Sequence, residues 1–196
     1  MNIVKNIIIS FVFMALWQMP LGAQSSMNMD FGIVMGGDGN MISDSIAGFR
    51  NGYTLGMHGD YGTYGFYISP GVYFQDFTID NNYKYIEPFV KSERIKLLKA
   101  KVLLGYKTNL FTRKLKFKFG GGFNGSYIIN IAKNDKGVDF KSLSDTYYAY
   151  SFDVGLDIFS VSVNLSYEKT LKEVLSLQGN SGYFDFVIVT LGVRLW

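Results

Sequence analysis

The stretch Lys114–Tyr127, KLKFKFGGGFNGSY, repeats its chemistry every second residue. One set of alternate positions holds large apolar side chains: Leu115, Phe117, Phe119, Phe123 and Tyr127. The other set holds mainly lysine, glycine and asparagine. Side chains of a β-strand point alternately to its two faces, whereas those of a helix share a face at spacings of three and four. The stretch is therefore predicted to be a strand with one apolar and one polar face.

The same alternation runs through most of the chain after residue 27. It predicts eight strands, at residues 28–37, 48–61, 64–78, 94–107, 114–128, 146–158, 160–171 and 184–196. The fourth, RIKLLKAKVLLGYK, is the least regular, and part of it also fits an amphipathic helix. Pro70 lies inside the third strand and cannot donate a ladder hydrogen bond, so a local bulge is expected there.

The connections between these strands alternate between short turns and long polar loops. Hairpins with short turns at one end and long loops at the other are typical of a transmembrane β-barrel, in which the short turns face the periplasm. Charged residues make up 18% of the chain, below the roughly 25% of soluble domains. A soluble sandwich or lipocalin-like barrel also alternates. Its strands would be shorter, and a face of glycine, serine, asparagine and charges would make a poor soluble core.

Residues 1–23 fit a cleaved export signal. Lys5 precedes the apolar stretch Ile7–Trp17, which is too short to span a bilayer, and small Gly22 and Ala23 precede the predicted cleavage site. Residues 24–196 are expected to form the barrel domain. The chain has no cysteine, which excludes a lipoprotein anchor and disulfides. The formal net charge of +3 gives no reason to expect a nucleic-acid partner.

Several segments rich in glycine and aromatic residues resemble the PorT-like outer membrane protein β-barrel domain family of Bacteroidetes. They are MDFGIVMGG, GFRNGYTLGMHGDY, YISPGVYFQ, KAKVLLGYK, FKFGGGFNGSYI and VTLGVRLW. The resemblance implies an all-β fold, an eight-stranded antiparallel up-and-down barrel in the outer membrane of a Gram-negative bacterium. Its implied partners are outer-membrane lipid and the barrel-assembly machinery, with terminal Trp196 as the assembly signal. Alternation puts Trp196 on the inward phase, so either it leaves the ladder or the last strand's register is shifted by one.

The interior of an eight-stranded barrel is just wide enough for side chains to fill it. The polar faces of the predicted strands place a mixed set of charges inside: Arg50, His58, Asp60, Lys99, Lys101, Lys116, Lys118, Asp153, Asp157, Glu168 and Arg194. Buried charges persist when they are paired and hydrogen-bonded. We therefore expect a structural salt-bridge network rather than an open conduit.

No catalytic, cofactor or metal site is expected. His58 is the only histidine and would serve as general base in a lipid-modifying barrel, with Ser69 or Asp60 nearby. It belongs to no arrangement of nucleophile, base and orienting group, and it lies toward a short turn. The expected role is structural, with a protein or glycan partner bound by the long loops. Candidate contacts are the aromatic residues Tyr53, Phe74, Phe77, Tyr83 and Tyr85, although an aromatic girdle and loop packing explain most of them better. The alternatives are a component of an envelope secretion or transport assembly, a narrow solute conduit, or that lipid-modifying enzyme.

Overall fold

The computed structural model describes residues 24–37, 50–63, 65–78, 94–110, 114–132, 143–177 and 180–195. Their strands are β1 (Gln24–Gly37), β2 (Arg50–Thr63), β3 (Phe66–Thr78), β4 (Arg94–Asn109), β5 (Leu115–Ile131), β6 (Thr146–Ile158), β7 (Val161–Thr170), β8 (Leu175–Leu177), β9 (Asn180–Gly182) and β10 (Asp185–Arg194). Within these ranges, no helix is long and apolar enough to cross a membrane.

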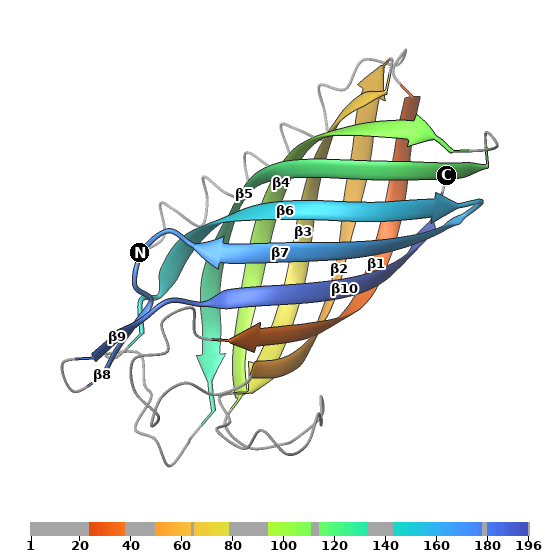
Figure 1. Ribbon diagram of the computed structural model, residues 1–196. Coiled ribbons are helices and arrows are strands. Elements are labelled where there is room, and N and C mark those ends of the chain that lie inside the picture. Colours follow the sequence, from red (N-terminus) through yellow and green to blue (C-terminus); the bar gives the residue numbers. More distant parts are fainter. Residues whose placement is uncertain are drawn as a thin grey trace.

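Eight of the strands form a closed antiparallel barrel in the order β1-β10-β7-β6-β5-β4-β3-β2 (Figure 1). Because β1 pairs with both β2 and β10, the first and last strands close the barrel. All eight predicted strands are confirmed, and the helical alternative for the fourth is wrong, because β4 is extended throughout. The small β8–β9 hairpin lies outside the barrel sheet and was not predicted.

The two ends of the barrel differ. At one end β1 begins, β10 ends, and the connections β2–β3, β4–β5 and β6–β7 are short; we call this the short-turn end (Figure 1). At the other end lie the four long connections, including the β8–β9 hairpin; we call this the loop end (Figure 1).

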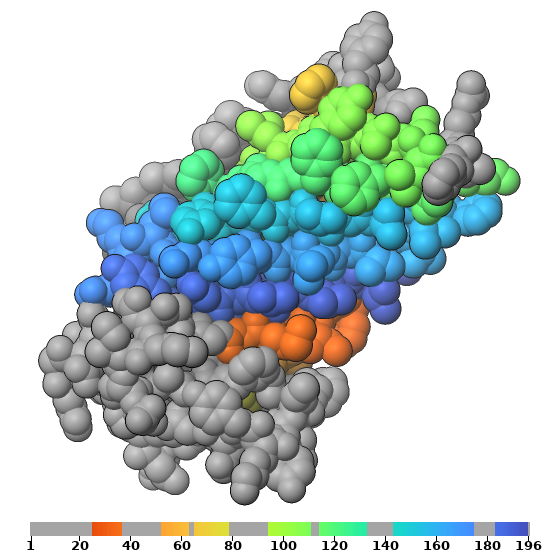
Figure 2. Space-filling view, in the orientation of Figure 1, coloured from red at the N-terminus to blue at the C-terminus, as the bar shows by residue number. Residues whose placement is uncertain are grey.

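The alternating sequence assigns one face of each strand to the outside. Exposed outward side chains are large and apolar, among them Leu104, Phe123 and Leu191, which are 65%, 67% and 57% exposed. Buried inward positions on the same strands include Lys101, Asn124 and other polar residues. The described strands form a continuous wall along the side of the barrel (Figure 2). The apolar outer belt and polar lining are the reverse of a soluble domain, as in a membrane barrel.

Pro70 does not produce the expected bulge. His58 stands opposite Gly71 and Tyr61 opposite Ile68, so β2 and β3 keep one register on both sides of Pro70. The missing N–H is accommodated by an interruption of the ladder rather than by an inserted residue. A register shift occurs instead between Lys96 and Leu97, where β5 carries one extra residue.

Candidate functional site: the filled barrel interior

The charge layer nearest the short-turn end centres on Asp157 of β6. Its carboxylate lies 3.0 Å from Arg194 Nη2, 3.1 Å from Lys118 Nζ and 3.3 Å from Lys107 Nζ. Lys107 Nζ also donates to Asp60 Oδ2 at 2.6 Å. These five side chains come from β2, β4, β5, β6 and β10. The layer therefore connects strands that are not neighbours in the sheet.

The next layer centres on the pair of Asp30 and His58. His58 Nδ1 lies 2.5 Å from Asp30 Oδ2, which also accepts a hydrogen bond from the Tyr73 hydroxyl at 3.2 Å. The other ring nitrogen, Nε2, lies 3.1 Å from Asn28 Nδ2 and 3.5 Å from Asp60 Oδ1. Both ring nitrogens are thus engaged by groups on β1 and β2. The imidazole holds the inner wall together and has no free nitrogen aimed at open space.

Asp30 also lies at the seam where the barrel closes. It stands opposite Gly192 of β10. A Cβ atom on Gly192 would lie 2.4 Å from Asp30 Oδ1 and 2.2 Å from Ser162 Oγ, closer than real Cβ contacts come. The absence of a side chain at Gly192 therefore makes the space that the Asp30 carboxylate occupies. Glycine is needed here because a side chain would not fit, and not because of the backbone conformation.

The central layer contains the most deeply buried charges. Lys99 contacts Glu168 directly and donates to Gln75 Oε1 at 2.6 Å. Lys101 Nζ donates to both carboxylate oxygens of Asp153 at 2.9 Å and lies 3.6 Å from Glu168 Oε1. Lys99 and Glu168 are each 2% exposed. Charges this deeply buried are stable only because each has a counter-charge within reach.

The three layers contain charges of both signs. Asp60, Asp153, Asp157 and Glu168 pair with Lys99, Lys101, Lys107, Lys118 and Arg194, and Asp30 pairs with His58. Such an arrangement ties strands together and does not select ions of one sign, as a ring of like charges would.

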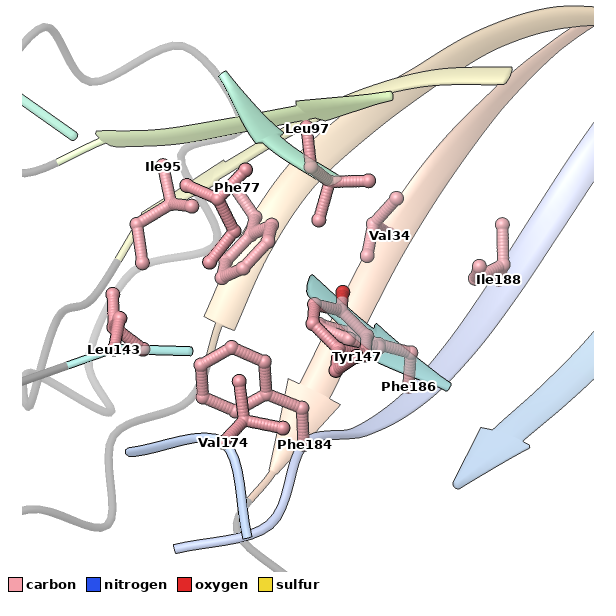
Figure 3. Packing of buried hydrophobic residues seen from close by; sticks show 11 residues of the cluster. Val34, Phe77, Ile95, Leu97, Leu143, Tyr147, Val174, Phe184, Phe186 and Ile188 are labelled. Carbon is pink, nitrogen blue, oxygen red and sulfur yellow. The ribbon is translucent and has the colours of Figure 1, made fainter. Parts of the chain in front are cut away.

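The loop end of the interior is apolar. We call the buried cluster there the apolar plug: Val34, Phe77, Ile95, Leu97, Ile128, Leu143, Tyr147, Val174, Phe184, Phe186 and Ile188 (Figure 3). Its rings meet edge to face, with centroid separations of 5.1 Å for Phe77 and Phe186 and 5.8 Å for Phe77 and Phe184. This geometry favours aromatic pairs. Interiors of membrane barrels are usually polar, so the plug is a departure from the expected lining.

Two long loops contribute to the plug through their flanking residues. Leu143 precedes β6 and Val174 follows β7, and both are buried in it. The backbone N–H of Ser144 donates to the carbonyl of Val174 at 2.9 Å. Below the plug, Lys99 Nζ lies 5.8 Å from the Phe186 ring centroid. The plug therefore rests on the central charge layer and is pinned from the loop side.

A cavity of about 40 Å³ remains between the charge layers. Asp30, His58, Tyr67, Ser69 and Lys101 are among the residues that line it. A space of this size holds ordered water, whereas pockets for organic ligands measure roughly 300–1,000 Å³. This cavity therefore offers sites for water rather than a pocket for an organic ligand.

The catalytic alternative finds little support in this geometry. Ser69 and His58 line the same cavity, but no hydrogen bond joins them in the described part of the chain. Both nitrogens of His58 are engaged as described above. Within the described ranges, no group of three or more histidine, cysteine, aspartate or glutamate side chains is placed to hold a metal ion.

The structure places most of the predicted interior residues inside the barrel. Seven are buried: His58, Asp60, Lys99, Lys101, Lys118, Asp157 and Glu168. Asp153 and Arg194 join the same ion pairs with partial exposure, and Lys116 is half-buried on the same face of β5. Arg50 begins β2, but its side chain lies outside the described residues, as do Trp196 and residues 1–23.

Sequence reasoning missed three features of the site. Asp30 and Lys107 were left out, although Asp30 shares its phase with Asn28 and Lys107 shares its phase with Lys101. The apolar plug was also missed. Phe77, expected among the surface aromatics, is fully buried in the plug, because its odd position in β3 points inward.

Of the other aromatic residues predicted at the surface, Tyr53 and Phe74 lie in the described strands. The Tyr53 hydroxyl donates to Asp76 Oδ2 at 3.2 Å, and its ring lies under the Arg94 guanidinium. The Phe74 ring lies 6.3 Å from that of Tyr53. Tyr83 and Tyr85 lie outside the described residues.

Comparison with solved structures shows the fold. The chain is similar to the crystal structure of Neisserial surface protein A (NspA), with 15% identity and a TM-score of 0.55, over 88% of this chain and 97% of that one. It is similar to the crystal structure of the outer membrane enzyme PagL, with 14% identity and a TM-score of 0.53, over 84% of this chain and 98% of that one. No protein-family model and no curated protein matches the sequence. The fold is that of the small eight-stranded outer-membrane barrels.

Proposed function

We propose that the protein is a structural barrel of the outer membrane that acts through its long loops. One observation carries this proposal: in the described part of the chain, three charge layers and the apolar plug occupy the barrel interior around a cavity of about 40 Å³. A barrel filled in this way is a rigid support rather than a pore.

The outer surface supports the location. Its exposed side chains form an apolar belt along every barrel strand, the arrangement that lipid favours. The short turns would face the periplasm and the long loops the outside of the cell, as in bacterial barrels. The cleaved signal at residues 1–23 and the assembly signal at Trp196 remain expectations that fit this location.

The loop end supports recognition. Loops carry binding residues on rigid scaffolds. Here the flanks of two loops are fixed by Leu143 and Val174 in the plug and by the Ser144–Val174 hydrogen bond. The residues that flank these two loops are already ordered in the free protein, so less conformational entropy is lost there when a partner binds. This favours binding through the loops. A protein or glycan of the cell surface is the proposed partner class.

Loop replacement tests the proposal. Residues 38–49 or 79–93 are replaced by short glycine–serine turns, and the tagged full chain is purified from native outer membrane in mild detergent. Both replacements lie between the strands, and Phe77 and Ile95, the plug residues that flank residues 79–93, are kept, so the barrel should still fold. We expect a partner that co-purifies with the wild-type chain and is lost in one of the variants. Unchanged recovery of partners in both variants would contradict a role for these loops.

The PorT-like alternative is separated by the same purification. A component of an envelope assembly would elute in a stable complex of fixed stoichiometry. A loop-binding barrel would elute as a monomer that exchanges its partner. The proposal predicts the monomer.

A further inference from the structure

The charge layer nearest the short-turn end, taken by itself, has more cations than carboxylates. Its two carboxylates, those of Asp60 and Asp157, are shared by three cations: Lys107, Lys118 and Arg194. The Asp60 and Asp157 side chains are 5% and 3% exposed, whereas those of Lys107 and Arg194 are 15% and 26% exposed. The short connections at this end, residues 64–65, 110–114 and 159–160, contain no aspartate or glutamate. The layer therefore buries its acids and turns its positive charge toward the mouth of the barrel.

Lys116 adds a further cation to this layer without adding a counter-charge. It is half-buried on the inner face of β5 and stands opposite Asp157 of β6. Asp157 already serves three cations, and in the part of the chain that the structure describes no ion pair or hydrogen bond reaches the Lys116 ammonium. Two residues along β5, Lys118 stands opposite Lys107, so that like charges face each other. A partly buried excess of one sign is costly, and it attracts an ion of the other sign.

Arg194 brings unused hydrogen-bond donors to the same aspartate. Its Nη2 donates to Asp157 Oδ2 at 3.0 Å and its Nη1 to the Phe159 carbonyl at 3.3 Å. A guanidinium has five N–H donors, so these two bonds leave others free, and Nε finds no acceptor among the described residues. The backbone N–H of Arg194 donates to the Ser160 carbonyl at 2.7 Å, which fixes the end of β10. The arginine is thus held in place before any ligand arrives.

We propose that the short-turn mouth binds a small oxyanion, of the phosphate class, through Lys116 and Arg194. The planar fork of a guanidinium matches the oxygens of such an anion, and the lysine ammonium supplies a point charge. Both side chains face the inside of an eight-stranded barrel, which side chains nearly fill. A single small anion suits that space better than a polymer or a lipid headgroup does. This binding is separate from the proposed role of the long loops and does not depend on it.

Phosphate titration of the full mature barrel tests the site. The protein is refolded in dodecyl maltoside, a nonionic detergent without phosphate, and unfolded by urea at constant ionic strength with chloride as the replaced anion. The urea midpoint of wild type should rise with phosphate and saturate, because the ligand binds the folded state. Lys116→Gln breaks no described contact and removes an unpaired charge, so in chloride it should be at least as stable as wild type. Its apparent affinity for phosphate should be lower by about tenfold or more. General salting effects of phosphate act equally on both proteins, so the difference between them reports the site.

Lys114→Gln is the matched control, because it removes the same charge from an exposed residue at the same end. Its apparent affinity should stay within about twofold of wild type. In the nitrogen-15-labelled barrel, phosphate should shift the amide signals of Lys116 and Arg194 and leave those of the apolar plug in place. No saturable effect in wild type, or an equal loss in both variants, would overturn the site, the second by showing a diffuse basic surface. Phosphate-free phosphatidylcholine vesicles provide the last arm: stabilisation by added phosphatidylglycerol that Lys116→Gln abolishes would place the anion in the lipid and overturn the site inside the barrel.

Discussion

Removal of the Glu168 carboxylate should be among the most damaging changes to the interior. Glu168 is 2% exposed and serves two cations: it contacts Lys99 directly and lies 3.6 Å from Lys101. In Glu168→Gln, Lys101 keeps Asp153 at 2.9 Å, whereas Lys99 keeps only the neutral Gln75. One ammonium would then be buried without a counter-charge. Breaking a buried pair in this way costs about 3–5 kcal/mol.

Urea unfolding of the refolded barrel in micelles measures this loss, followed by the heat-modifiable mobility of the folded form on gels. Glu173→Gln is the matched control, because Glu173 is exposed and its substitution should change the free energy of unfolding by less than about 0.5 kcal/mol. Adding Lys99→Met to Glu168→Gln removes the unpaired ammonium and should recover most of the loss. A Glu168→Gln barrel within about 0.5 kcal/mol of wild type would refute the reasoning.

Three further changes probe other parts of the barrel. Gly192→Ala should destabilise the barrel by about 1–3 kcal/mol, because the new Cβ would lie 2.4 Å from Asp30 Oδ1. Gly121→Ala is the control and should be tolerated, because its Cβ would lie 3.5 Å from the Phe152 ring. Equal urea midpoints for the two variants would contradict this expectation. Phe186→Ala should cost about 3–5 kcal/mol by the same assay through a cavity in the plug; a cost below about 1 kcal/mol would show that the plug is not tightly packed. Deletion of Trp196 should reduce the amount of barrel assembled in cell outer membranes far more than it lowers the stability of refolded protein; normal assembly would exclude its role as the assembly signal.

The period-two pattern was sufficient to predict the strands and their two faces. Strand β5 shows why: Phe119 and Phe123 point outward and Lys118 and Asn124 inward, as the alternation requires. Even the ambiguous β4 follows the rule, since Lys99 and Lys101 are buried and Leu98 and Val102 are exposed. A strand has only two sides, so the pattern within one segment decides the direction of each of its side chains.

Contacts between strands could not be predicted in this way. The pattern predicted an inner position for His58, but it did not identify Asp30 and does not reveal that register brings Asn28 of β1 opposite His58 of β2. Phe77, Ile95 and Phe186 share the inward phase of their strands, although Phe77 was expected at the surface, and this phase does not show that the three gather at one end. Their meeting depends on strand stagger around the closed barrel. Because a polar lining was expected throughout the interior, the apolar plug was not predicted.

Single-channel recording in planar lipid bilayers tests the central claim most directly. The full mature barrel is inserted, and its folded state is confirmed by heat-modifiable mobility. Because the charge layers and the apolar plug fill the interior, the wild-type barrel should give no discrete conductance steps at any applied voltage that the bilayer withstands. Regular, reproducible steps from the wild-type protein would contradict the closed interior and would establish a conduit.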